Sequence, residues 1–468
     1  MQQKLFISSV VILSSITFKV LSNGGDNDRP NIIFLLTDDQ RWDALGYAGN
    51  KEIHTPTMDK LAKEGVYFKN VFVTTPISSA SRASILTGLY ERTHGFTFQT
   101  GNLPKEYMDL SYPVLLRDNG YKTAFYGKFG VFYNNPESLF DEAEIYDRDA
   151  QKGYYYKTID EDTVHLTPYT GYVARKFIQE SSSNTPFCLS ISFSAPHAHD
   201  PAPEQYFWGE EADKLYNDIT ISDPKLGEDQ YFMALPQEVR EGFNRTRWKW
   251  RYDTPEKYQH SVKGYYRMIS EVDSEIKKIM ETLEEKGIAD NTVIIFMGDN
   301  GYFLGERQLA GKWLMYENSL RVPLIMFDPR HKEHRDVTET VLNIDIASTI
   351  LDLASVAIPE IYQGKSLKNY AISNHVLPKR EAVLFEHLWN KDEIPSSEAV
   401  RTDKWKYFRY RFIDAPEELY DLENDPMETK NLASNPSYKS TLNYMRKECD
   451  KLIKKYRDAR ILPSIKYD

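Results

Sequence analysis

The segment Asn31-Ile32-Ile33-Phe34-Leu35-Leu36 is an unbroken apolar run that ends in Thr37-Asp38-Asp39. A strand covered on one face alternates apolar and polar residues, whereas a strand covered on both faces is apolar throughout, as in parallel sheets. A second run of the same kind, residues 292–297 (Thr-Val-Ile-Ile-Phe-Met), ends in Gly298-Asp299-Asn300. The two runs favour a large, mainly parallel sheet with helices on both faces.

Helical patterns alternate with these strands. Residues 186–193 and 322–327 are further strand candidates, and residues 57–64 and 270–285 have helical periodicity, the latter followed by Gly287. Strands that alternate with helices predict an α/β fold in which helices sandwich the sheet. Two stretches with little periodicity, residues 134–165 and 200–258, are predicted to be long loops over one rim of the sheet, where substrate-contacting loops usually lie.

The pattern changes near residue 370. Strand-like pieces at 382–385, 405–410 and 418–422 precede a charged helix at about 436–457. They predict a small antiparallel sheet with one packed helix. We therefore divide the mature chain into an N-terminal α/β domain, residues 25–370, and a C-terminal subdomain, residues 371–468.

The N-terminus predicts an export signal over residues 1–24. Lys4 gives the positive start, residues 5–21 are mostly apolar, and residues 22–28 are polar. An N-terminal anchor is the alternative, but interleaved Ser and Lys19 make a poor membrane span, so no stable membrane insertion is expected. No Cys lies near the predicted cleavage site, which argues against a lipoprotein. We expect a secreted or periplasmic protein.

Composition limits the classes of partner. The 468 residues include 58 Lys plus Arg and 69 Asp plus Glu, a formal charge of −11, which argues against a general nucleic-acid binder. An anionic substrate is not excluded, because a local group of cations can override the net field. Cys188 and Cys449 lie in different environments and are predicted to be free thiols.

Two acidic pairs follow the two apolar strands. Ligands bind at the carboxyl ends of strands in open parallel sheets, so Asp38-Asp39 and Asp299-Asn300 could converge on one point. Their carboxylate and amide oxygens form a hard ligand set that favours Ca²⁺ over zinc. The alternative is that each Asp caps a helix or a turn.

Ser78 precedes an apolar run, residues 85–88, that predicts a short helix. Arg82 would lie one turn into that helix on the same face, and a helix N-terminus favours a nearby anion. A plain Ser is a weak nucleophile unless a base activates it, and no neighbour in the sequence is an obvious base. A Ser-rich helix cap explains the spacing equally well.

The run Ser78-Ser79-Ala80-Ser81-Arg82, followed by Leu86-Thr87-Gly88, resembles the signature of type I sulfatases of the alkaline phosphatase superfamily. In that family a Cys or Ser opens the motif and is oxidised to formylglycine. Other segments resemble the family in the same order along nearly the whole mature chain. They are residues 29–32 with the first acidic pair, 56–66, 120–124 with 127–128, 299–301 with Lys312, and 419–422 with 425–426 and 431–432.

The resemblance implies a mechanism. Oxidised Ser78 hydrates to a geminal diol, one hydroxyl attacks sulfur in line, and the other then loses its proton so that sulfate leaves and the aldehyde is restored. It implies Ca²⁺ as cofactor and a sulfated carbohydrate as substrate. The implied ligands of the metal are Asp38, Asp39, Ser78, Asp299 and Asn300; Arg82 would hold the diol, Lys128 and Lys312 the sulfate, and His197 would be the general acid, with a structural loop His as its alternative.

The sequence departs from the family at one position. Many members follow the sulfate-binding Lys with an aromatic residue and then a His that helps to deprotonate the hemiacetal, but here Lys128 is followed by Phe129 and Gly130. His197, a metal-bound water or a different geometry would have to replace it. Ser rather than Cys at position 78 implies a further partner, a formylglycine-generating maturation enzyme of the anaerobic radical type.

Residues 303–306, 315–317 and 319–323 resemble family members that act on sulfated sugars, including 6-O-sulfated N-acetylglucosamine. We expect an exo-acting sulfatase for glycosaminoglycan or mucin-type glycans, with His387 and Trp389 at the sugar site or, alternatively, packed between the domains. Two other functions stay open. A phosphoester or phosphonate hydrolase in its two-zinc form would need extra His and Asp ligands after Asp299-Asn300, and no matching His appears there. A non-catalytic glycan-binding relative would suit Gly130, but the intact Ser78, Arg82 and the two lysines oppose it.

Overall fold

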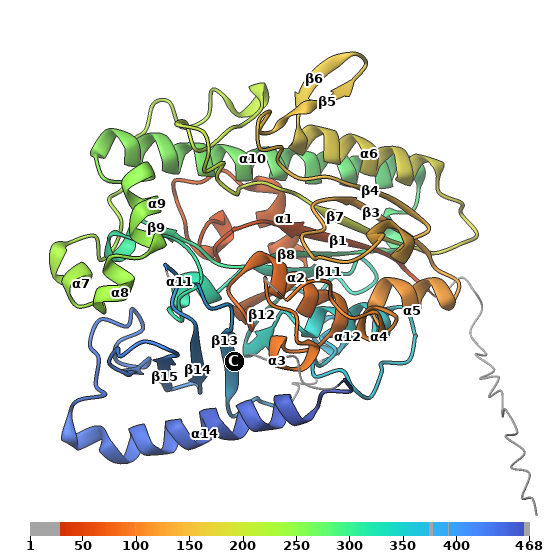
Figure 1. The fold of residues 1–468 in the computed structure, drawn as a ribbon. Coiled ribbons are helices and arrows are strands. Elements are labelled where there is room, and N and C mark those ends of the chain that lie inside the picture. Colours follow the sequence, from red (N-terminus) through yellow and green to blue (C-terminus); the bar gives the residue numbers. More distant parts are fainter. Residues whose placement is uncertain (1–28, 99, 374–377, 392, 463–468) are drawn as a thin grey trace, which may run out of the picture.

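The computed structural model describes residues 29–98, 100–373, 378–391 and 393–462, and an eight-stranded sheet lies at its centre (Figure 1). Every neighbouring pair of strands is parallel except the two pairs that β11 makes with β8 and β2. The predicted large, mainly parallel sheet is thus confirmed. In spatial order the strands are β12 (Arg335–Leu342), β2 (Val66–Phe72), β11 (Leu324–Phe327), β8 (Thr292–Gly298), β1 (Asn31–Thr37), β7 (Phe187–Ser192), β3 (Lys122–Gly127) and β4 (Glu142–Ile145).

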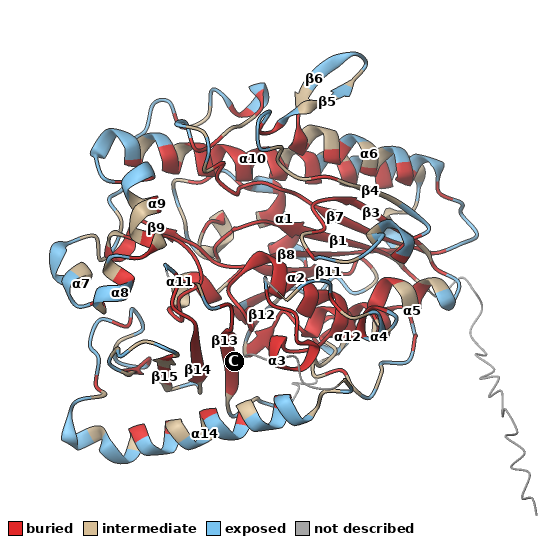
Figure 2. Cartoon of the chain, in the orientation of Figure 1, coloured by how far each residue is buried: buried red, intermediate tan, exposed pale blue. Residues whose placement is uncertain are grey.

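Alternate residues of β1 enter two separate hydrophobic cores. Ile33 and Leu35 pack with the helices α1 (Pro56–Glu64), α6 (Leu166–Glu180) and α10 (Pro255–Lys286). Ile32, Phe34 and Leu36 pack on the other face with α2 (Ser78–Thr87), α5 (Tyr112–Asp118) and α12 (Asp345–Leu353). Figure 2 shows the central strands buried between these helical layers. Burial on both faces is the reason that the strand is apolar without a break.

The register brings four strand ends to one edge of the sheet. In β1 and β8, Thr37 lies opposite Gly298, and in β3 and β7, Gly127 lies opposite Ser192. Because β8, β1, β7 and β3 are neighbours, the residues that follow each strand meet at the same edge. This edge contains the predicted site.

Helix α10 is longer than predicted, since it begins at Pro255 and not near residue 270. Thr254 caps it by accepting from the Lys257 amide, and Gly287 ends it. Its first half buries Tyr, Ser and Gly where the pattern requires aliphatic residues, which hid the periodicity. The two loop stretches also contain short elements, namely the hairpin β5 (Tyr155–Ile159) and β6 (Asp162–His165), and the helices α7 (Asp229–Met233), α8 (Gln237–Arg240) and α9 (Phe243–Arg251).

The predicted C-terminal sheet and helix are present. The antiparallel strands β13 (Val383–His387), β14 (Ser397–Arg401), β15 (Trp405–Tyr410) and β16 (Glu418–Asp421) pack against α14 (Lys439–Asp458). The helix α13 (Lys368–Ile372) spans the boundary that we placed at residues 370 and 371, and both of those residues pack in the core of the large sheet. Cys188 and Cys449 are both buried free thiols.

The predicted signal peptide, residues 1–24, lies outside the described residues. Within the described part of the chain, every helix is too short or too polar to cross a membrane.

Candidate active site

The two acidic pairs meet at the shared strand edge. Asp38, Asp39, Asp299 and Asn300 are all fully buried. The Asp39 amide donates to Oδ1 of Asp299 at 3.0 Å, and Nδ2 of Asn300 donates to Oδ1 of Asp39 at 2.6 Å. Asp39 has a φ of 71°, a left-handed conformation that costs a non-glycine residue about 1–3 kcal/mol. The fold thus keeps the side-chain oxygens of these four residues close together, although the backbone of Asp39 is strained and the carboxylates repel one another.

Ser78 is the first residue of α2, and its hydroxyl points at both acidic pairs. Its Oγ lies 2.8 Å from Oδ1 of Asp38 and 3.0 Å from Oδ1 of Asn300, and it accepts from Nζ of Lys312 at 3.1 Å. All ten residues of α2 are buried, so the helix N-terminus that carries Ser78 is rigidly packed. The structure brings together the predicted nucleophile and the predicted metal ligands.

Three buried cations surround this centre. Arg82 donates from Nε to Oδ2 of Asp299 at 2.8 Å and from Nη1 to the Lys128 carbonyl at 2.7 Å. The ammonium groups of Lys128 and Lys312 contact Asp38 and Asp39, respectively. Burial alone would raise the pKa of Asp38, but the charges of Lys128, Lys312 and Arg82 hold it well below its usual range. Asp38 therefore stays ionised.

The remaining oxygens fit a hard cation. The single Ser78 proton faces two acceptors, and Oδ2 of Asp39 is buried without a hydrogen-bond partner among the described residues. Ligand atoms of Asp38, Asp39 and His197 lie within 4.8 Å of one another. Asp299 is already engaged by Arg82 and by the Asp39 amide, while burial and then the charge of Asp38 raise its pKa to about 6. A set dominated by carboxylate and amide oxygens suits Ca²⁺ better than zinc.

His197 faces the same centre with one nitrogen. Its Nδ1 lies 2.6 Å from the Ala198 carbonyl, which can only accept, so Nδ1 carries the proton. Its Nε2 lies 3.6 Å from Oδ2 of Asp39. Burial first, and then the charges of Arg148 and Lys312, hold the pKa of His197 well below its usual range. The imidazole is therefore neutral, with Nε2 available as a proton or metal acceptor.

Gly130 lies where the sequence departs from the family. Its φ is 71°, and a Cβ added there would lie 2.8 Å from Cδ of Arg82 and 3.5 Å from Cε of Lys128. The backbone at this position is thus pressed against the buried arginine. A side chain in place of Gly130 would displace Arg82, so the chain cannot place a His from position 130.

A cavity of about 560 Å³ opens above Ser78. Lys128, His197 and Lys312 line its floor, and Trp389 lines its wall, where it packs against Phe98 with ring centroids 4.9 Å apart. His387 is fully buried and is not among the described residues that line the cavity. Of the two predicted sugar-site residues, the structure places only Trp389 at the cavity wall.

Several lining residues were not predicted from the sequence. They come from the stretches with little periodicity or from a loop of unusual backbone conformation, and none belongs to a recognisable motif. Trp313, with a φ of 83°, could have been suspected as the neighbour of Lys312. The residues are Asp147, Arg148, Asp200, Arg247 and Trp313.

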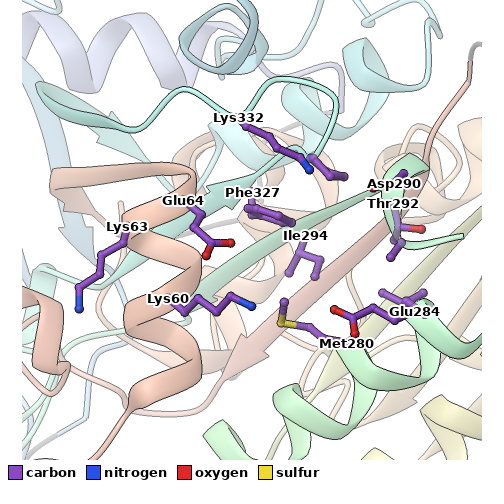
Figure 3. Close-up of a pocket in the computed structure, with 13 residues that line it drawn as sticks. Lys60, Lys63, Glu64, Met280, Glu284, Asp290, Thr292, Ile294, Phe327 and Lys332 are labelled. Atoms are coloured by element: carbon purple, nitrogen blue, oxygen red, sulfur yellow. The ribbon is translucent and has the colours of Figure 1, made fainter.

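A second cavity, of about 330 Å³, lies at the opposite end of β8, beside Thr292 (Figure 3). Lys60 extends across it toward Met280, whereas Lys63 points away (Figure 3). Three lysines and three acidic residues line it, namely Lys60, Lys63, Lys332, Glu64, Glu284 and Asp290. It lacks the convergent charges found beside Ser78.

Comparison with known proteins agrees with this geometry. A model of the Sulfatase family matches residues 30–356, and a model described as N-sulphoglucosamine sulphohydrolase, C-terminal, matches residues 305–455. The N-acetylglucosamine-6-O-sulfatase of Bacteroides thetaiotaomicron is 28% identical over 92% of this chain and 88% of its own length.

Two solved structures have the same fold. One, a complex with its substrate D-glucosamine-2-N,6-O-disulfate, has a TM-score of 0.78 and 25% identity, over 92% of this chain and 98% of that chain. The other, the phosphonate monoester hydrolase of Agrobacterium radiobacter, has a TM-score of 0.73 and 21% identity, over 92% of this chain and 96% of that chain. The second likeness concerns the fold alone.

Proposed function

The chain belongs to the sulfatase family, and we propose that it hydrolyses sulfate esters carried by carbohydrates, with Ser78 matured to formylglycine and Ca²⁺ bound beside it. Water and a sulfate ester would give the free sugar hydroxyl and hydrogen sulfate. The observation that carries the proposal is the Ser78 hydroxyl, which lies within 3.0 Å of both Asp38 and Asn300 at the floor of an open cavity.

Each floor residue has a role that follows from its charge. Lys128 and Lys312 would bind the sulfate oxygens as the charge on the transferred group shifts. Arg82, fixed by Asp299 and the Lys128 carbonyl, would hold the oxygens of residue 78. When present, the hydrated aldehyde would supply the nucleophile toward sulfur, and Ca²⁺, held by Asp38, Asp39, Asp299, Asn300 and residue 78, would supply positive charge. Nε2 of His197 would first accept a proton released in the attack on sulfur and then donate it to the sugar oxygen as that oxygen leaves.

The cavity wall supports a sugar as the leaving group. Phe98, Phe132 and Trp389 present aromatic faces, and Phe98 and Phe132 are 40% and 50% exposed. Flat apolar faces suit the C–H faces of a pyranose ring, while nearby polar groups fix its hydroxyls. The names of the similar proteins favour a sulfated glucosamine as the substrate. We therefore propose an exo-acting enzyme that removes sulfate from glycosaminoglycan or mucin-type glycans, including 6-O-sulfated N-acetylglucosamine.

The maturation step has a direct test. The tryptic peptide of residues 70–82 contains Ser78 together with Ser79 and Ser81. Protein produced together with the radical maturation enzyme, which acts as the oxidant, should lose two hydrogen atoms from this peptide, and fragmentation should place the loss at residue 78. Protein made without that enzyme, and the Ser78→Ala variant, should each show the mass calculated from its own sequence, with no loss of two hydrogen atoms.

Activity is tested on position-defined sulfated monosaccharides. Matured wild type should release sulfate from at least one of them, and Ser78→Ala should release none. Equal rates for the two proteins would overturn the proposed chemistry, and turnover of aryl sulfates alone would overturn the carbohydrate substrate.

The two alternatives raised by the sequence have little support. The phosphonate hydrolase resembles this chain in fold only, and the described site has no second cluster of His and Asp ligands near Ser78. A non-catalytic role does not account for the intact floor of charged residues. We also propose that the enzyme acts after export from the cytoplasm, as the N-terminal sequence predicts.

A further inference from the structure

Arg148 reaches the site from a segment that no sequence motif marks. It follows β4, the strand beside β3, and lines the cavity together with Ser78, Lys128 and Lys312. Its side chain is 16% exposed, and Nη1 lies 3.7 Å from Oδ2 of Asp38 and 3.4 Å from Oδ1 of Asp147. A formed charge-assisted hydrogen bond of this type measures about 2.7–2.9 Å. These carboxylates therefore attract the guanidinium but do not use all of its N–H donors.

Around Ser78, the positive and negative side chains at the floor of the cavity are equal in number only when Arg148 is counted. The four cations Arg82, Lys128, Arg148 and Lys312 lie among the four carboxylates of Asp38, Asp39, Asp147 and Asp299. A bound divalent cation would give this floor an excess of two positive charges, which attracts a sulfate ester. Loss of Arg148 would halve that excess.

We propose that Arg148 binds the sulfate group of the substrate through two guanidinium N–H groups. The inference rests on the proposed function, and it adds a residue to the sulfate site. A guanidinium suits this task because it is permanently charged and its planar fork matches two oxygens of one anion.

The test uses the matured, calcium-loaded full chain and the variants Arg148→Met and Arg148→Lys. Arg148→Met should lower kcat/KM by on the order of 10- to 100-fold, the effect of losing a hydrogen-bonded charge. It should weaken inhibition by inorganic sulfate by a similar factor. Arg148→Lys should lie between Met and wild type, since it keeps the charge but not the fork. The control Arg117→Met removes a cation on α5 whose Nη1 donates to the Ser138 carbonyl, and it should leave both values unchanged.

Two readouts locate the lost contact. Weaker inhibition by inorganic sulfate separates sulfate binding from a loss of folded enzyme, and the comparison of substrates separates a sulfate contact from a sugar contact. Because every substrate shares the sulfate, the loss should be equal for an aryl sulfate and a sulfated sugar. Wild-type values of kcat/KM and of sulfate inhibition in Arg148→Met would overturn the inference and leave the proposed function intact. If that variant does not fold, wild-type values in Arg148→Lys would overturn it. A matured wild type that hydrolyses no sulfate ester would instead refute the proposed function.

Discussion

Replacing Gly130 by Ala tests whether this position is closed to side chains. The positive φ alone costs a non-glycine residue about 1–2 kcal/mol. The new Cβ would also lie 2.8 Å from Cδ of Arg82, which cannot retreat without stretching its bonds to Asp299, Ser192 and the Lys128 carbonyl. Losing one such charged hydrogen bond costs about 1.5–3 kcal/mol. We expect Gly130→Ala to lower the free energy of unfolding by about 3–4 kcal/mol in total.

Gly287→Ala is the matched control. Its φ of 73° is nearly the same as that of Gly130, but nothing lies within 4 Å of its added Cβ. It should therefore cost only the backbone part, about 1–2 kcal/mol, and leave activity unchanged. Urea unfolding followed by circular dichroism measures both variants, and kcat/KM should fall by on the order of 100-fold for Gly130→Ala alone, because Arg82 is displaced. Equal stability of the two variants, with full activity in both, would refute the reasoning.

Three further perturbations test the cation site, the buried His94 and the aromatic wall of the cavity at Trp389. Chelation should abolish turnover and lower the melting temperature, because the oxygen ligands beside Ser78 lose the cation that binds them only in the folded state, and Ca²⁺ but not Zn²⁺ should restore both; full activity after exhaustive chelation would exclude the metal. Burial and then Arg460 lower the pKa of His94 to about 3 in the folded state. Below about pH 6.5 the unfolded state therefore binds a proton that the folded state does not, and the free energy of unfolding falls as the pH is lowered. At about pH 5 this amounts to about 2 kcal/mol in urea titrations, which His94→Gln should remove and the exposed His331→Gln should not. Trp389→Ala should raise KM for a sulfated sugar by on the order of 10-fold, as expected for a lost aromatic contact, and leave KM for an aryl sulfate unchanged; equal effects on both substrates would contradict a sugar-binding role.

The acidic residues of the site could be predicted because they follow buried strands. The apolar runs identified β1 and β8, and the rule that ligands bind at carboxyl strand ends placed Asp38 and Asp299 at one edge. The same reasoning could not supply Arg148 or Arg247. They come from stretches whose residues pack irregularly against several elements, so no period of 2 or 3.6 marks them. Their positions depend on tertiary contacts alone.

Helix α10 and His387 show a second limit. The first half of α10 buries tyrosines such as Tyr265, whose hydroxyl donates to the Asp39 carbonyl, and a hydrophobic pattern does not count such residues as core. His387 belongs to a short strand of the C-terminal sheet, and the sequence cannot say which face of that strand meets the larger domain. A shift of one residue in the strand register moves every side chain to the opposite face. The sequence therefore does not determine whether a polar residue on such a strand faces the cavity or the interior.

The surroundings of Ser78 argue against an unmodified serine as the nucleophile. A serine needs a neighbouring base of suitable pKa. The carboxylate at 2.8 Å, Asp38, is a weak base, because the charges of Lys128, Lys312 and Arg82 outweigh its burial and hold its pKa well below the usual range. In the described part of the chain, His197 contacts Ala198 and Asp39, and Lys312 donates to the hydroxyl. The site thus stabilises negative charge on residue 78, whereas the available proton acceptor, Nε2 of His197, faces Asp39 at 3.6 Å and not the Ser78 hydroxyl. A hydrated aldehyde, whose hydroxyls are more acidic than that of serine, relieves this limitation, which supports maturation of Ser78 to formylglycine.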